Sequence, residues 1–480
     1  CIYDDNGISI DGEVDGWFSE DVPGRFEAYG WRVIRNVDGH DADEISRALQ
    51  TAIDSDGRPT LVCCRTTIGF GSPNKQGTAG VHGAALGDEE IAATREALGW
   101  MHPAWEIPQE YYEAWGQTQR GGDRQRAWQQ EYDRFAAAEP AKAAEFERRM
   151  AGELPENWSA AVDALASQEQ QALSVMETRK ASQRCIGAIA AGIPELFGGS
   201  ADLTGSNNTR WEGATDDQHM SYGVREFAMT AISNGLQLHG GYRPFTGTFL
   251  IFMEYARNAV RLAALMKIPN IFVYTHDSVA VGEDGPTHQP VEQIANLRST
   301  PNLFTWRPCD TIESAVAWRS AIASRTAPSA LIFTRQKTQG QARDKQTFEN
   351  IQRGGYTLID CDGDPQAIVI ATGSEVEVAV AAAQQLAAEG VCVRVVSMPC
   401  VELFSEQGVE YQRQVLPPSV RARVAVEAGH PDLWHKFVGL DGAVVGIDRY
   451  GLSAPGDLAM EACGITAAAV VTATKRVMGL

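Results

Sequence analysis

The chain has 480 residues, of which 44% are hydrophobic and 21% charged, and its formal net charge is −21. This length exceeds what one hydrophobic core supports, so we expect two or three domains. The acidic balance argues against a general binder of nucleic acids or membrane surfaces, because both need basic faces. No run reaches the roughly 18 to 20 apolar residues that a membrane-spanning helix needs. An anionic substrate is compatible with this charge if its basic residues are gathered locally.

The nine cysteines are scattered, with no C-x-x-C pair, which predicts reduced thiols in a cytoplasmic protein. The first residues, CIYDDNGISIDG, predict the end of a buried strand followed by a polar turn. They include no initiator Met, and no basic region followed by an apolar one. We therefore interpret Cys1 as a cut point inside a domain.

Strands alternate with helices along the chain, which predicts an α/β fold with mainly parallel sheets. In the first block, PTLVCCRTTIGFGS predicts a strand that runs into a glycine-rich loop. A helix is expected to begin at Asp88, because Glu89 and Glu90 follow in its first turn, where acids suit the helix dipole. Residues 109–171 are rich in Ala, Glu, Arg and Trp and predict a helical connector.

The second block, about 172–339, contains the strands ELFGGSADL, IPNIFVYTHDS and SALIFTRQ, each followed by polar residues. The carboxyl ends of parallel strands are where such sheets bind ligands. A third block begins near Arg353 with the strands QAIVIATG and VCVRVVSMP. Between them, Ser374 and Glu377 form an S-x-x-E pattern that predicts a capped helix running to Gly390. This block shows no reactive constellation, so a structural or assembly role is expected.

The most informative segment is HDSVAVGEDGPTHQP, from His276 to Pro290. It combines two histidines, three acids (Asp277, Glu283 and Asp284) and two glycines beside an apolar strand. A single histidine in that place is more often a structural residue with a core partner. The combination of histidines, acids and glycines in one short segment predicts an active-site loop, because the glycines let the backbone approach a ligand.

This loop closely resembles the signature of transketolases, and the resemblance extends over residues 1–480. Segments that match in the family's order are YDDNGISIDG, TTIGFGSPNK, HGAALG, ATREALGW, GGSADLTGSN, YGVREFAM, FLIFMEYARNAVR, WRPCD and ATGSEVE. The resemblance implies three α/β domains: two of the thiamine diphosphate-binding fold and one like the transketolase C-terminal domain. Residues 1–140 would be the later part of the diphosphate-binding domain plus the connector, 172–345 the pyrimidine-binding domain and 353–480 the C-terminal domain.

The implied activity is the transfer of a two-carbon ketol unit through a thiamine diphosphate carbanion, in the pentose phosphate pathway. The donor would be a ketose phosphate such as xylulose 5-phosphate, and the acceptor an aldose phosphate such as ribose 5-phosphate. The family implies a cytoplasmic homodimer whose cofactor lies between two subunits. Two alternatives are a dihydroxyacetone synthase, which accepts formaldehyde, and a non-catalytic or split subunit that needs a separate N-terminal chain.

Glu226, in YGVREFAM, matches the family's glutamate that binds the cofactor's aminopyrimidine and favours its imino tautomer, which then takes the thiazolium proton. Without the family, an ion pair with Arg225 would be the simpler interpretation. Phe249, Phe252 and Tyr255 match the aromatic pocket around the pyrimidine. Their spacing alone would indicate the buried face of a helix.

Asn6 and the carbonyl of Ile8 match the end of the family's metal motif, which would hold Mg²⁺ or Ca²⁺ with the diphosphate. By itself DDNG indicates a turn. The family's G-D-G opening, which carries a metal-binding aspartate, is absent. We therefore expect this 480-residue chain alone to be inactive.

Further residues match family positions around cofactor and sugar. His82, in VHGAALG, matches a histidine near the diphosphate and the donor, and Asp202 lies in a segment that faces the cofactor. Arg179, Ser206, His288 and Arg335 match phosphate-binding residues, while Asp284 and His276 match residues that contact sugar hydroxyls. Catalytic roles are expected for Glu226, His276 and His82. The chain departs from common family patterns at three positions: Ala79, Phe227 and Lys337.

Overall fold

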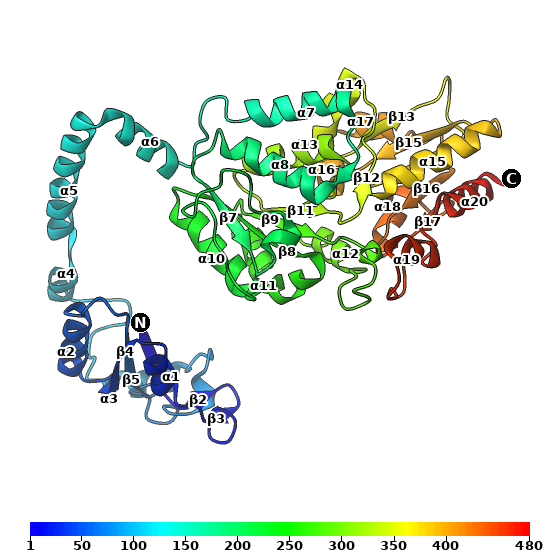
Figure 1. Ribbon diagram of the computed structural model, residues 1–480. Helices are drawn as coiled ribbons and strands as arrows, with labels where there is room; N and C mark the ends of the chain where they lie inside the picture. The colour runs from blue at the N-terminus through cyan, green and yellow to red at the C-terminus, as the bar shows by residue number, and fades with distance from the viewer. The chain divides into compact units, whose positions relative to one another are not determined.

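The computed structural model describes all 480 residues of the protein (Figure 1). The chain divides into two compact units, Cys1–Glu131 and Tyr132–Leu480. The boundary falls inside helix α5 (Thr118–Ala138). The three main sheets are wholly or mainly parallel, with helices between their strands, which confirms the predicted α/β class.

The first unit contains a three-stranded parallel sheet in the order β1-β5-β4. Its centre is β5 (Thr60–Arg65), whose TLVCC residues are buried, as the β-branched run predicts. The edge strand β1 (Ile2–Asp5) is not a buried strand as predicted: it pairs on one side only, and Ile2 is 64% exposed. The other elements are the hairpin β2 (Ile8–Ser9) and β3 (Gly12–Glu13), α1 (Val22–Ala28), β4 (Arg32–Asp38), α2 (Ala42–Ile53), α3 (Asp88–Ala97) and α4 (Gln109–Trp115).

The predicted helical connector is helical throughout most of its length. After α4 and α5 come α6 (Pro140–Met150) and α7 (Ala160–Ala172). Arg148 at the end of α6 bonds Glu195 at 2.8 Å and Glu145 at 2.7 Å. Because Glu195 is buried just before the next strand, this pair attaches α6 to the sheet of the second unit.

The middle sheet of the second unit is wholly parallel, in the order β10-β11-β9-β8-β7. Strands β8, β9 and β11 are buried along their whole length, and β9 and β11 are mostly apolar, as expected for a sheet covered on both faces. In β9, Ile271 and Val273 face one hydrophobic cluster, while Phe272 and Tyr274 face another. The strands are β7 (Leu196–Ser200), β8 (Arg243–Phe249), β9 (Ile271–Thr275), β10 (Phe304–Trp306) and β11 (Ser329–Phe333).

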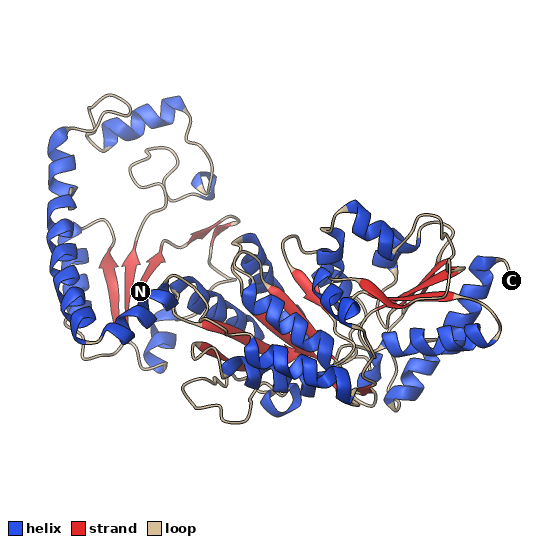
Figure 2. Cartoon of the chain, turned by 90° about the horizontal axis from the view of Figure 1, so that it is seen from above, coloured by secondary structure: helices blue, strands red, loops and turns tan.

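Helices cover both faces of this sheet (Figure 2). On one side α13 (Thr311–Ala323) packs against α7 and α8 (Thr178–Ala190). On the other, α10 (Glu226–His239) packs against α11 (Met253–Leu265). Short elements complete this part: β6 (Met176–Glu177) paired with β12 (Lys337–Thr338), α9 (Thr204–Asn207), α12 (Gln293–Arg298) and α14 (Lys345–Asn350).

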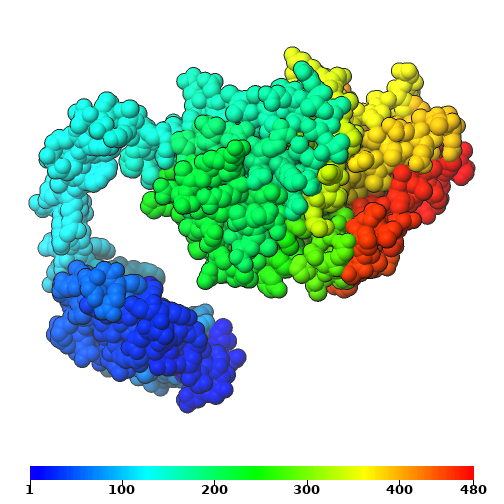
Figure 3. Space-filling model, in the orientation of Figure 1, coloured from blue at the N-terminus to red at the C-terminus, as the bar shows by residue number.

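The third sheet has the order β13-β15-β14-β16-β17, and only β13 is antiparallel to its neighbour. One hydrophobic cluster runs from the middle sheet into this one, and Figure 3 shows the two parts as one continuous body. Its strands are β13 (Tyr356–Ile359), β14 (Ala367–Ala371), β15 (Val393–Ser397), β16 (Arg423–Val426) and β17 (Ala443–Val445). Its helices are α15 (Glu375–Ala388), α16 (Val401–Ser405), α17 (Val409–Val415), α18 (His435–Val438), α19 (Gly456–Ala462) and α20 (Ala467–Met478).

Two local predictions about this part are wrong. Ser374 precedes α15 but makes no capping bond: its hydroxyl donates to Glu375 Oε1 at 2.6 Å and accepts from Gln336. Cys361 and Cys392 are not reduced thiols but form a disulfide, while the other seven cysteines are free. The antiparallel pairing of β13 with β15 brings the end of one strand beside the beginning of the other, which sequence spacing does not reveal.

The segment Gly456–Met478 has the length and composition of a membrane span, contrary to the expectation that no segment does. It is not one helix, however, since a turn separates α19 from α20. Helix α20 packs against β16, β17 and α15. This segment is therefore weak evidence for a membrane span, because a core helix passes the same test.

Candidate functional site

The carboxyl edge of the middle sheet collects most of the predicted site residues. Asp202 follows β7, Phe249 ends β8, His276 follows β9 and Arg335 follows β11. Because all five strands are parallel, these ends meet at one edge, where open α/β sheets bind ligands. Glu226, at the start of α10, reaches the same edge, since its carboxylate lies 3.5 Å from the Thr248 hydroxyl of β8.

A cluster of rings lines this edge. The Phe249 and Phe252 rings are stacked, with centroids 5.6 Å apart, and Tyr255 lies 6.1 Å beyond Phe252. The His276 ring stacks on Phe249 at 3.7 Å, and the His288 ring meets Phe252 edge-on at 5.4 Å. Phe249 is buried, whereas Tyr255 is 69% exposed. The cluster thus presents a flat apolar surface that opens outward, suited to a planar heterocycle.

His276 is held in a constrained state. Its φ of 61° lies in the left-handed region, and its side chain is buried. Its Nδ1 lies 2.8 Å from the Thr275 hydroxyl, which donates to Asn207 Oδ1 at 2.6 Å. Burial, reinforced by the charges of Arg179 and Arg335, lowers the pKa of His276 to about 3. The imidazole is therefore neutral at physiological pH.

Glu226 is a buried carboxylate with few partners. It is the first residue of α10, where the helix dipole favours negative charge. The hydroxyl of Thr248, at 3.5 Å, is a long hydrogen bond. The alternative interpretation, an ion pair with Arg225, does not hold, because Arg225 donates to the carbonyl of Tyr222 at 2.9 Å. A buried carboxyl with this much unused bonding capacity can receive a hydrogen bond from a ligand.

Two arginines form the positive side of the site. Arg179, in α8, is half-buried and donates to the Ser206 carbonyl at 2.8 Å, while its buried Nε has no partner. Arg335 donates to the Val281 carbonyl at 3.0 Å and is otherwise exposed. Burial, together with the neighbouring charge of Arg335, lowers the pKa of Arg179. Two guanidinium groups whose charges influence each other favour the binding of an anion between them.

The loop after β9 is anchored at its far end. Gln289 donates to the carbonyls of Gly282 at 2.8 Å and Leu452 at 2.9 Å. His288 is half-buried, with its Nδ1 2.9 Å from the Thr287 hydroxyl. Asp284 is exposed at the turn of this loop, and Asp202 is exposed with a left-handed φ of 59°. Neither carboxylate makes a hydrogen bond or ion pair within the chain, so both are available to a ligand.

The remaining predicted residues, Asn6, Ile8 and His82, lie in the first unit, after β1 and β5. Asn6 Oδ1 accepts from the Ile8 N–H at 2.9 Å, which makes the DDNG segment the turn that its composition indicates. No group of three or more His, Cys, Asp or Glu side chains is arranged to hold a metal. Two oxygens, from Asn6 and the Ile8 carbonyl, fit only part of a Mg²⁺ or Ca²⁺ ligand set. His82 is exposed at the end of the 3₁₀ turn Ala79–Val81.

Sequence reasoning missed His40. It follows β4, and its Nε2 accepts from the Thr67 N–H at 2.9 Å, while its ring stacks on Phe70 at 3.8 Å. It therefore lies at the carboxyl edge of the first sheet, as does Asn6, which follows β1. The signal was present: WRVIRNVDGHD is a β-branched run with a polar ending, like the strands of the second block.

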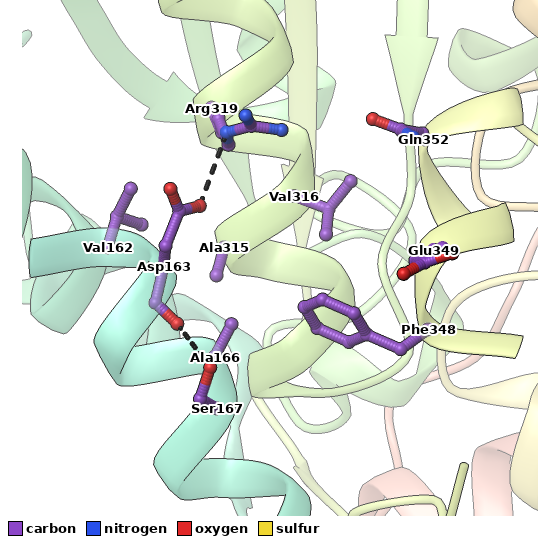
Figure 4. Close-up of a pocket in the computed structure, with 10 residues that line it drawn as sticks. All are labelled: Val162, Asp163, Ala166, Ser167, Ala315, Val316, Arg319, Phe348, Glu349 and Gln352. Atoms are coloured by element: carbon purple, nitrogen blue, oxygen red, sulfur yellow. Dashed lines mark hydrogen bonds and ion pairs between the residues drawn. The ribbon is translucent and has the colours of Figure 1, made fainter. Parts of the chain in front are cut away.

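Two cavities in the second unit differ in their relation to these residues. One of about 390 Å³, between α7, α13 and α14, is shown in Figure 4. Within its lining, Arg319 pairs with Asp163 at 3.2 Å, and no predicted site residue lines it. The other, of about 540 Å³, adjoins Arg335 where the middle and third sheets meet. Only the second is connected to the candidate site.

Comparison with known proteins places these features in one family. Three family models match: "Transketolase, thiamine diphosphate binding domain" over residues 1–155, "Transketolase, pyrimidine binding domain" over 174–341 and "Transketolase-like TK C-terminal domain" over 354–466. The chain is 54% identical to Transketolase 1 of Vibrio cholerae, over all of this chain and 73% of that protein.

Solved structures give the same result. The transketolase of Leishmania mexicana matches with a TM-score of 0.92 and 40% identity, over all of this chain and 71% of that one. A Pichia stipitis transketolase in complex with sedoheptulose 7-phosphate matches with a TM-score of 0.91 and 36% identity, over 100% and 71%.

Proposed function

Because the chain belongs to the transketolase family, and so to the transferases, we propose that it transfers a two-carbon ketol unit between phosphorylated sugars. The donor would be a ketose phosphate such as xylulose 5-phosphate and the acceptor an aldose phosphate such as ribose 5-phosphate, in the pentose phosphate pathway. The observation that carries the proposal is the joint placement of buried Glu226, the stacked rings and two arginines at one sheet edge.

The match to a thiamine diphosphate-binding family model supports that cofactor, which supplies an electron sink for the reacting carbon when it is bound. Glu226 would accept a hydrogen bond from the aminopyrimidine ring, since its carboxylate is buried and has little other bonding. Phe249, Phe252 and Tyr255 would hold that ring by stacking. The residues would thus orient the cofactor, with a proton shared between the Glu226 carboxyl group and the ring.

For the sugar, we propose that Arg179, Ser206, His288 and Arg335 bind the phosphate. The partnerless Nε of Arg179 and the exposed guanidinium of Arg335 support this, because a planar fork suits a phosphate. His276, neutral and backed by the Phe249 ring, would bond sugar hydroxyls together with Asp284. Similar solved structures include transketolases in complex with sugar phosphates, which supports this assignment.

The first unit would bind the diphosphate end. We propose that Asn6 Oδ1 and the Ile8 carbonyl contribute to a Mg²⁺ or Ca²⁺ site, with His82 near the diphosphate and Asp202 near the cofactor. These two oxygens are part of a ligand set, so we also propose that the 480-residue chain alone is inactive. Turnover of a ketose and aldose phosphate pair by the purified chain would contradict this second statement.

We propose that the working enzyme is a cytoplasmic homodimer. In support, α10, α11 and the residue after α11 carry apolar side chains that the second unit leaves exposed, each by 45 to 66%: Phe227, Ile232, Leu238, Leu262, Leu265 and Met266. Exposed apolar groups gathered on neighbouring helices indicate a protein interface. Sedimentation of the purified protein tests the dimer, and imaging of a tagged protein tests the location.

The test of the function is an assay with thiamine diphosphate, Mg²⁺ and a ketose phosphate, with aldose acceptors of different length. Formation of the ketose two carbons longer than the acceptor supports ketol transfer. Preference for formaldehyde would favour the alternative, a dihydroxyacetone synthase. A protein that turns over only after a separate N-terminal chain is added would be a split subunit.

A further inference from the structure

Arg307 lies at the centre of a buried charge cluster that joins the middle sheet to the third. It follows β10 and is 0% exposed. Its Nε and Nη2 both donate to Asp277 Oδ2, at 3.1 and 2.7 Å. Its Nη1 bonds Glu375 and also lies 3.3 Å from Glu427 Oε1. One side chain of the middle domain therefore reaches two acids of the third.

Those two acids mark a specific place in the third sheet. Glu375 begins α15 after β14, and Glu427 follows β16, so both lie at carboxyl ends of neighbouring strands. Strand β14 has β15 on one side and β16 on the other, which makes this the point where the strand order reverses. Open α/β sheets bind ligands in the crevice at that point. Here the crevice holds the guanidinium of Arg307.

The crevice is shaped to hold this side chain. The Thr372 carbonyl accepts from Arg307 Nη1 at 3.3 Å, and the Gly373 N–H donates to the Arg307 carbonyl at 3.0 Å. Gly373 has a φ of +58°, and a Cβ there would lie 2.8 Å from Arg307 Cζ. Only glycine leaves room for the guanidinium at this position.

Arg307 keeps its charge although the cluster is buried. Arg298 bonds Glu427 Oε2 at 2.6 Å, so two arginines face three acids. Burial alone would lower the pKa of Arg307, but the charges of Glu375, Asp277 and Glu427 outweigh it and raise that pKa. Removing one partner from such a buried set leaves an uncompensated charge, which is strongly unfavourable. The position of Asp277 is therefore closely tied to that of Arg307.

Asp277 directly follows His276 in the chain. Its Oδ1 has no hydrogen-bond partner, so Arg307 is the anchor of this carboxylate. His276 has a left-handed backbone, which a non-glycine residue keeps only where its surroundings hold it there. On one side it is held by β9 and on the other by the anchored Asp277.

We propose that Arg307 is a positioning residue: through Asp277 it fixes His276 against Phe249. The third domain binds the Arg307 guanidinium and so holds it in place. The inference rests on the proposed contact of His276 with substrate. It assigns the third domain a part in building the site, although that domain contributes no group to the reacting atoms.

The test compares Arg307→Lys and Asp277→Asn with a matched control, Arg343→Lys. Arg343 is also fully buried and bonds Asp310 at 2.7 Å and the Tyr356 hydroxyl at 2.8 Å, but it does not touch Asp277 or the 276–290 loop. Hydrogen exchange of peptides from 276–290 is measured on the protein with thiamine diphosphate present. The ring resonance of His276, assigned through His276→Asn, reports its stacking on Phe249.

We expect exchange in 276–290 to rise about tenfold in both test variants, with a displaced His276 resonance, and to stay unchanged in the control. If Arg307→Lys fails to fold, Asp277→Asn decides, because it keeps the side-chain volume. Equal loosening in the control, or an unmoved His276 resonance in Asp277→Asn, would overturn the proposal. These readouts need no turnover, so the positioning role and the proposed ketol transfer are contradicted by different outcomes.

Discussion

The His276 ring stacks on the Phe249 ring with centroids 3.7 Å apart and planes 30° from parallel. One residue follows β9 and the other ends β8, so neighbouring strands bring them together. In the proposed function, Phe249 contacts the cofactor and His276 the sugar. The cofactor and the sugar would then bind to two rings in contact. A substitution at either residue would therefore change the affinity for both ligands.

Replacing Glu226 by Gln in a transketolase that turns over with these domains should lower kcat roughly 10²- to 10⁴-fold, because the amide cannot hold the proton that a carboxyl can. The fold should persist, since the side-chain volume is unchanged; circular dichroism checks this. Glu254→Gln is the control, as Glu254 is also in the first turn of its helix, α11, but bonds Gln293 and Asn296. Unaltered turnover in Glu226→Gln would contradict the catalytic role proposed for Glu226.

Replacing Arg179 or Arg335 by Ala should raise the KM for phosphorylated sugars about tenfold or more, with a smaller effect on kcat, because a charge-assisted bond to the phosphate is lost. An unphosphorylated sugar should be affected much less. Arg184→Ala is the matched control, since Arg184 lies on α8 with Arg179 but pairs with Glu169 at 2.6 Å. Equal losses for both kinds of sugar would contradict the phosphate role.

His276 should remain neutral far below the ordinary histidine range. Its pKa is lowered from 6.5 to about 3 by burial and by the two arginines, so an NMR titration should find it uncharged at pH 5. The unfolded chain binds a proton there that the folded chain does not, so this histidine's share of stability is present above pH 6.5 and is lost as the pH falls toward 3. Inorganic phosphate bound beside it should raise the pKa. A midpoint near 6.5 without added anions would contradict the buried placement.

Replacing Cys361 by Ser should lower the free energy of unfolding of the third domain by about 2–4 kcal/mol, because the bridge to Cys392 restricts the unfolded chain. Reductant should lower the stability of the wild type and have little effect on the variant, as urea unfolding followed by Trp434 fluorescence can show. Cys463→Ser is the control, since Cys463 is free. A wild-type protein in which all nine cysteines react with a thiol reagent without reduction would contradict the bridge.

Much of the fold could be predicted because its strands have local signals. The runs that became β5, β7, β9, β11, β14 and β15 are largely apolar, and the parallel pairing of β7, β9 and β11 in one sheet puts the polar residues that follow them at one edge. His40 was overlooked because β4 was not identified as a strand, although its sequence has the same form. Where the strand was identified, its terminal residues could be identified too.

Other features depend on contacts between segments far apart in sequence. Ser374 fits a capping pattern, but its hydroxyl instead accepts a hydrogen bond from the side-chain amide of Gln336, 38 residues earlier. Cys361 and Cys392 meet only because β13 runs antiparallel to β15. Arg307 has no local sign of its role, since its acids lie 30, 68 and 120 residues away. Such pairings follow from tertiary packing, which a single sequence does not display.

The Arg307 crevice also limits how these domains can recombine in evolution. A foreign third domain grafted after the middle one would receive a buried guanidinium and would need a glycine at the place of Gly373 and acids at those of Glu375 and Glu427. Conversely, a middle domain without this arginine would leave Glu375 without a cation, while Glu427 would keep only Arg298. A chimera that replaces one of the two domains should therefore lose stability at this junction unless it keeps the arginine, the glycine and the acids together.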